Sequence, residues 1–133
     1  MGDRDALLIL AQRASWEDRF QVSSLAASTA AAGKQVDVAF FFGALDAWAR
    51  GEWDRLDPTP PIDAQRLGSL PMPPLSEILL NARTDDQLRL YACSASVRIL
   101  GLDPQLVQVE VDAILGWQSF SRMIGDASSV VTF

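Results

Sequence analysis

Cys93 is the only cysteine of this chain, and its position in the sequence favours chemistry. An apolar stretch typical of a strand, residues 87–92, precedes it, and a stretch typical of a helix, residues 94–100, follows it. A helix N-terminus offers unpaired backbone N–H groups and partial positive charge, which favour a thiolate over a thiol. Free cysteine is also often a small buried hydrophobic residue, so a structural role for Cys93 stays open.

The rest of the composition narrows what this thiol can do. The chain has no histidine, which excludes a Cys–His pair, a Ser–His–Asp triad and histidine metal sites. A single cysteine excludes an internal disulfide and a cysteine-rich zinc site. We therefore expect no metal and no cofactor. A lone thiol can still accept and pass on sulfur as a persulfide, or form a mixed disulfide with a partner.

Other familiar ligand motifs do not fit this chain. The loop after the first predicted strand, residues 12–16, has no glycine and resembles neither a dinucleotide fingerprint nor a phosphate-binding P-loop. Arg98 follows Cys93 with four intervening residues, whereas the cradle of cysteine phosphatases has five, and a helix over 94–100 would turn Arg98 away from the sulfur. No pair of carboxylates at useful spacing suggests general acid–base catalysis.

Predicted strands alternate with predicted helices, which is typical of an α/β fold. Strands are predicted over residues 6–11, 34–42, 87–92, 109–115 and 128–133. Helices are predicted from an N-cap at Ser15 to a stop at Gly33, over 44–50, 75–82 and 94–100, from Asp103-Pro104, and over 119–124 with a stop at Gly125. Residues 1–133 then form one domain of three α/β/α layers around a five-stranded, mainly parallel, flavodoxin-like sheet. Residues 51–74 hold six of the seven prolines and are predicted to form an ordered loop or flap, with a disordered excursion as the alternative.

In a parallel sheet all strand-to-helix turns meet at the edge where α/β folds bind ligands. That edge would collect Cys93 and a set of site-lining candidates, which are Arg13, Trp16, Gly43, Ser94, Ser96 and Trp117. Either serine hydroxyl could cap the helix or donate to a thiolate or persulfide. Arg13 could supply positive charge near the sulfur or be an ordinary surface residue. These alternatives stay open.

Charge limits the classes of partner. The net charge is −6, and Lys34 and ten scattered arginines form no basic stripe, so we expect neither nucleic acid nor anionic membrane as a partner. No stretch approaches the length of a membrane span, and the apolar run 6–11 is too short for a signal peptide. The expected location is the cytoplasm.

Five stretches together resemble the DsrE/DsrF-like family, which includes sulfur-relay subunits. They are residues 6–11, 38–45, 90–102, 116–120 and 130–133, and the stretch around Cys93 is the most specific. The resemblance implies a three-layer fold with five mainly parallel strands, and homo-oligomers that are commonly trimers or hexamers. It also implies that Cys93 receives a persulfide and hands the sulfur on, with Ser94 and Ser96 in the same motif.

Two functions follow as expectations. The first is a sulfur carrier, or sulfurtransferase-like protein, that works through a Cys93 persulfide with sulfur-donor and sulfur-acceptor proteins as partners. The alternative is a non-catalytic oligomeric subunit or small-ligand-binding module, in which Cys93 is structural and the 51–74 flap serves as an interface.

Overall fold

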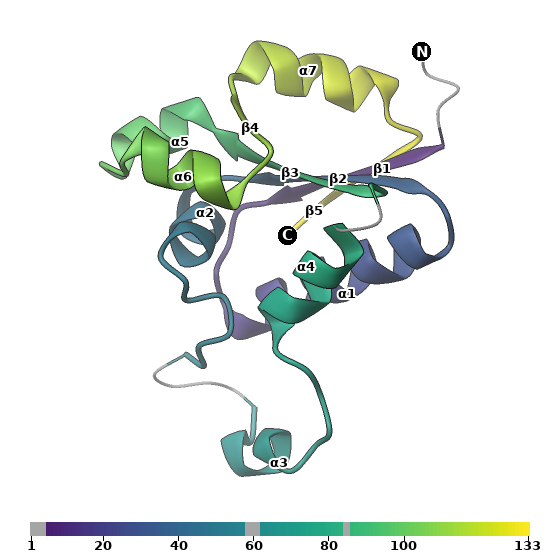
Figure 1. The fold of residues 1–133 in the computed structure, drawn as a ribbon, viewed down its shortest axis with the longest axis vertical. Coiled ribbons are helices and arrows are strands. Elements are labelled where there is room, and N and C mark those ends of the chain that lie inside the picture. The colour runs from purple at the N-terminus through teal and green to yellow at the C-terminus, as the bar shows by residue number, and fades with distance from the viewer. Residues whose placement is uncertain (1–4, 58–61, 84–85) are drawn as a thin grey trace.

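The computed structural model describes residues 5–57, 62–83 and 86–133, and these residues form an α/β fold around a five-stranded sheet (Figure 1). The strands are β1 (Ala6–Ala11), β2 (Gln35–Phe40), β3 (Leu88–Cys93), β4 (Ala113–Leu115) and β5 (Ser129–Thr132). Their order across the sheet is β4-β3-β2-β1-β5, and every adjacent pair is parallel. The predicted parallel sheet is thus confirmed. Every residue of β1 is buried, as its unbroken apolar sequence requires when both faces of a central strand are covered.

Helices cover both faces of this sheet. They are α1 (Trp16–Ala31), α2 (Phe42–Ala49), α3 (Ala64–Gly68), α4 (Leu75–Arg83), α5 (Ser94–Ile99), α6 (Pro104–Glu110) and α7 (Trp117–Asp126). In Figure 1, α7 crosses above the sheet, whereas α1, α2 and α4 lie below it. Helix α1 packs on α4, and α2 packs on α5 and α6. The predicted three layers are confirmed.

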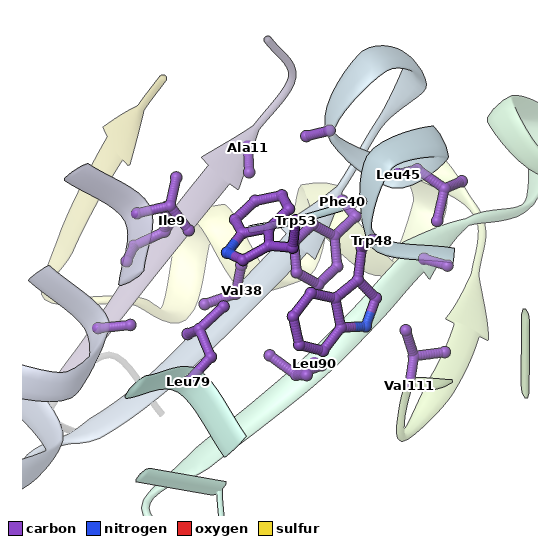
Figure 2. Close-up of a cluster of buried hydrophobic side chains, with 14 of the residues drawn as sticks. Ile9, Ala11, Val38, Phe40, Leu45, Trp48, Trp53, Leu79, Leu90 and Val111 are labelled. Atoms are coloured by element: carbon purple, nitrogen blue, oxygen red, sulfur yellow. The ribbon is translucent and has the colours of Figure 1, made fainter. Parts of the chain in front are cut away.

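Two hydrophobic clusters, one on each face, hold the layers together. The larger one lies on the α1 side and centres on three aromatic rings, Phe40, Trp48 and Trp53, whose centroids are 5.4 to 5.5 Å apart (Figure 2). The smaller one lies under α7 and consists of Leu8, Leu10, Ala39, Phe41, Cys93 and Phe120. The alternation of side chains along β3 decides this division, because Leu90 and Ala92 point to the large cluster and Cys93 to the small one.

Three predicted boundaries are wrong. The strand predicted over 109–115 is only Ala113–Leu115, because Asp103 caps α6 and the helix continues through Glu110. The last helix begins at Trp117 and passes through Gly125 to Asp126, so Gly125 is not its stop. The second strand ends at Phe40 because Phe42, with a φ of 38°, already begins α2.

The proline-rich segment is only partly a loop. It contains the short helix α3, whose first turn is capped by the carboxylate of Asp63. Its prolines 58, 60 and 61 fall outside the described residues. In the ranges that the structure describes, no helix combines the length and the apolar character needed to cross a membrane.

Candidate functional site

Cys93 lies at the place in the sheet where the chain changes from one face to the other. It is the last residue of β3 and pairs in register with Leu115, the last residue of β4. After β3 the chain enters α5, whose Val97 joins the large cluster, and after β4 it enters α7, whose Phe120 joins the small cluster on the opposite face. In α/β folds, ligands bind at the carboxyl ends of adjacent strands that continue to opposite faces, so the topology marks this place as the candidate site. We call this place the β3–β4 crevice.

The sulfur itself is enclosed. Cys93 is only 1% exposed and contacts the apolar cluster under α7. It occupies the N-cap position of α5, yet its side chain makes no capping hydrogen bond to the helix. The thiol is therefore close to the ligand-binding edge of the sheet but shielded from solvent in this conformation.

Two aromatic side chains, Phe41 and Phe120, share the buried cluster of Cys93, and a third ring, Trp117, packs on both of them. The ring of Phe41 lies 5.0 Å from that of Trp117 and 5.1 Å from that of Phe120, and the rings of Trp117 and Phe120 are 5.8 Å apart. Phe120 is fully buried, whereas Trp117 is 53% exposed. Trp117, the first residue of α7, is therefore the exposed member of this group of three rings.

The two serines that follow Cys93 differ in their surroundings. Ser94 Oγ faces Gly116 across the crevice, and a Cβ added at Gly116 would lie 3.6 Å from it. Ser96 is fully buried, and its hydroxyl has no hydrogen-bond partner among the described residues. Neither serine is a side-chain cap of α5, because the N-cap position is Cys93.

The structure brings Ser94 and Trp117 to the crevice with Cys93, but it places Arg13, Trp16 and Gly43 elsewhere. The Arg13 side chain is 74% exposed and 3.7 Å from Asp18, and its backbone N–H donates to the carbonyl of Phe133 beside β5. Trp16 is buried and stacks on Phe20 with 5.4 Å between ring centroids. Gly43 packs against the first loop, where a Cβ would lie 3.3 Å from the carbonyl oxygen of Gln12. Arg13 therefore supplies no charge to the sulfur here.

The chain matches no protein-family model and no curated protein. The assignment of a function to the β3–β4 crevice thus rests on its own geometry.

Sequence reasoning missed a second feature at the same edge of the sheet, a cavity of about 300 Å³ beside the ends of β1 and β2. Arg19, which is 3% exposed, is one of the residues that line it. The guanidinium donates to the carbonyls of Ala14, Glu52, Trp53 and Arg55 and to the carboxylate of Asp57. No local signal marks Arg19, because an arginine in the first turn of a helix is usually solvated.

This cavity holds opposite charges in pairs. Asp57 lies 2.9 Å from Arg19, and Glu52 lies 3.4 Å from Arg55. The hydrogen bond from Arg50 to Asp46 raises the pKa of the Arg50 guanidinium. Among the described residues no group of three or more acidic, cysteine or histidine side chains is placed to hold a metal ion.

Proposed function

We propose that the protein is a sulfur carrier that holds sulfur as a persulfide on Cys93. The observation that carries this proposal is the location of its only thiol at the carboxyl end of β3, in the crevice beside β4. The resemblance of residues 90–102 to the DsrE/DsrF-like family supports the same residue. Free thiols persist in a reducing compartment, so we place this activity in the cytoplasm.

The transfer needs no general base, metal or cofactor. The Cys93 thiolate attacks the outer sulfur of a donor persulfide, R–S–SH, and the S–S bond of the donor breaks. The donor leaves as a thiol, R–SH, and Cys93 becomes a persulfide, so the exchange is redox-neutral. The reverse exchange with an acceptor thiol regenerates Cys93. Donor and acceptor are therefore proteins or small molecules that carry thiols.

Burial sets a condition on this chemistry. A donor must reach a sulfur that is packed in one cluster with Phe41 and Phe120, whose rings contact the ring of Trp117. Trp117 is the exposed member of this group of three rings and follows Gly116, which is in extended conformation at the N-cap of α7. We propose that displacement of Trp117 opens the crevice when a donor docks.

A second candidate function is a non-catalytic subunit in which Cys93 is only a core residue. The 1% exposure of Cys93 and its apolar neighbours favour this alternative.

Both functions are compatible with a homo-oligomer, and we propose a trimer or hexamer. Leu106 and Val109 on α6 are both more than two-thirds exposed, and residues three apart lie on the same side of a helix. We call these two residues the α6 patch and propose that it contacts another copy.

Sulfur loading distinguishes the two functions. The native protein is incubated with glutathione persulfide, and its intact mass is measured after removal of the reagent. A sulfur carrier gains the mass of one sulfur atom, and Cys93→Ala abolishes the gain. A native protein that gains no sulfur, while the unfolded chain does, is the result expected of the structural subunit.

A further inference from the structure

The outer side of strand β5 has no partner strand in the described part of the chain. β5 is the last strand at one edge of the sheet and pairs with β1 alone. The N–H of Phe133 donates to Leu10 and its carbonyl accepts from Gln12, so both groups face β1. Because main-chain groups alternate in direction along a strand, those of Val130 and Thr132 point away from β1. We call the outward N–H and carbonyl groups of these two residues the β5 edge.

The β5 edge lacks the features that protect the edges of natural sheets. Such edges usually carry charged side chains, proline or a bulge, or belong to very short strands. The opposite edge of this sheet follows the rule, since β4 has three residues and comes directly after Asp112. Residues 127–133, in contrast, contain neither a charged side chain nor a proline, and Val130 is 40% exposed. The β5 edge is therefore suited to pair with a further strand.

The strand that fits this edge is β5 of a second copy. A two-fold axis beside Val131 makes the two strands antiparallel and places Val130 of each copy opposite Thr132 of the other. Both residues then form hydrogen-bonded pairs, and every group of the β5 edge gains a partner. An axis beside Val130 would instead place Thr132 opposite Ser128, whose N–H already donates to Ala6. The axis beside Val131 therefore gives the larger number of hydrogen bonds.

Charges at the two ends of β5 favour the same antiparallel arrangement. Arg13 lies at the carboxyl end, where its N–H donates to Phe133, and its side chain is 74% exposed. Asp126 is exposed at the end of α7, just before the amino end of β5. In the antiparallel pair, Arg13 of one copy lies near the level of Asp126 of the other, about 10 Å or two strand spacings away. The pairing thus brings opposite charges together at both of its ends.

We propose that two copies of this protein associate through their β5 edges and join their five-stranded sheets into one continuous sheet. An odd number of copies cannot pair all its β5 edges in twos, so this contact selects the hexamer over the trimer. The α6 patch is compatible with it, because α6 packs beside β4 at the opposite edge of the sheet. The pairing uses no residue of the β3–β4 crevice, so it does not depend on sulfur transfer.

A cysteine cross-link tests the pairing and its register. Val131→Cys places two thiols across the two-fold axis, where Cα atoms are about 4.5 Å apart and a disulfide forms without strain. Oxidation with diamide is expected to convert most of this variant into a covalent dimer on a non-reducing gel. Cys93 does not compete, since it is 1% exposed.

Thr132→Cys is the matched control for the cross-link. Thr132 is exposed, whereas Val131 is partly buried, so random collisions would favour a disulfide at position 132. In the proposed register its two copies are diagonal neighbours about 7 to 8 Å apart, which is too far for a disulfide. We expect this variant to form roughly tenfold less dimer than Val131→Cys.

Light scattering after size exclusion tests the same contact without added thiols. Val130→Pro removes an outward N–H that β1 does not use, and edge strands tolerate proline at such positions. The variant is expected to keep the circular dichroism of wild type and to have half its mass. Val130→Thr keeps the N–H and should retain the wild-type mass.

Three results would overturn the inference. They are a wild-type mass equal to one copy or to an odd number of copies, equal cross-linking of Thr132→Cys and Val131→Cys, and a folded Val130→Pro protein with the wild-type mass. If Val130→Pro does not fold, the comparison of the two cysteine variants decides. Sulfur loading of wild-type protein is measured separately, so a failure of the persulfide proposal is distinguished from a failure of the β5 pairing.

Discussion

The burial of the Cys93 sulfur has a direct consequence for its reactivity. Because the side chain is 1% exposed, an alkylating reagent reaches it only when the side chains packed around it move. We expect iodoacetamide to modify native Cys93 at least tenfold more slowly than the unfolded chain at the same pH. Mass spectrometry of time points gives both rates. Equal rates would mean that the crevice is open in solution.

The neighbours of Cys93 predict how substitutions affect stability. Cys93→Ser places a hydroxyl in the apolar cluster of Leu8, Leu10 and Phe120. Burial of a hydroxyl without a hydrogen-bond partner costs about 1 to 3 kcal/mol. Ala removes one atom and leaves a small void. We therefore expect Cys93→Ser to be less stable than Cys93→Ala in urea unfolding, although neither accepts sulfur. Equal stabilities would indicate a more polar environment than the one described.

The elements around the crevice differ in how far local signals determine them. Ser15 caps α1 through the N–H of Asp18, and Gly33 ends it with a φ of 85°, both as predicted. These signals act within one helix turn, so the sequence reveals them. The predicted boundary between α6 and β4 is wrong because the sequence of residues 104–115 is compatible with a helix as well as with a strand. Burial of Val107 and Val111, together with the bond from the Leu90 N–H to Asp112, settles it through contacts distant in sequence.

In the candidate site too, the features set by local sequence were predicted, and those set by contacts distant in sequence were not decided. The position of Cys93 at a strand-to-helix turn was predicted, because that turn is encoded locally. Its burial was only one of two open alternatives, because the side chains that enclose it include Phe41 and Phe120 of α7, which are distant in sequence. Arg13 and Trp16 were placed with Cys93 on the assumption that all turns at one edge meet. The sheet instead places β2 between β1 and β3, which separates them.

Helix α7 is expected to control access to the sulfur through its first residue. Trp117→Ala removes the exposed ring of the group of three rings, so native Cys93 should react with iodoacetamide several-fold faster than in wild type. Trp117→Phe keeps a ring against Phe41 and should change the rate less. The melting temperature of each variant, measured alongside, checks that α7 stays folded. An unchanged rate in Trp117→Ala would show that another element limits access.

Among the described residues, Arg19 of α1 makes most of the hydrogen bonds that join α1 to the segment after α2. Arg19 holds three backbone carbonyls between Glu52 and Arg55 as well as the Asp57 carboxylate. Removing one partner of a buried ion pair typically costs about 3 to 5 kcal/mol, and we expect Arg19→Ala to lose that much unfolding free energy. Limited proteolysis should then cut within residues 52–57. The control Arg13→Ala loses a mostly exposed contact and should change stability by less than about 1 kcal/mol.

At the scale of the whole molecule, the exposed apolar residues test the proposed oligomer. Leu106 and Val109 form the α6 patch, and Leu70, 53% exposed, lies in the 51–74 segment that is the alternative interface. A charge buried in an interface without a partner opposes association. We expect Leu106→Glu to reduce the mass measured by light scattering after size exclusion, and Leu70→Glu to leave it unchanged. The reverse result would assign the interface to the 51–74 segment. A wild-type mass equal to one copy would exclude the trimer and the hexamer, and α6 would then be free for a sulfur donor or acceptor.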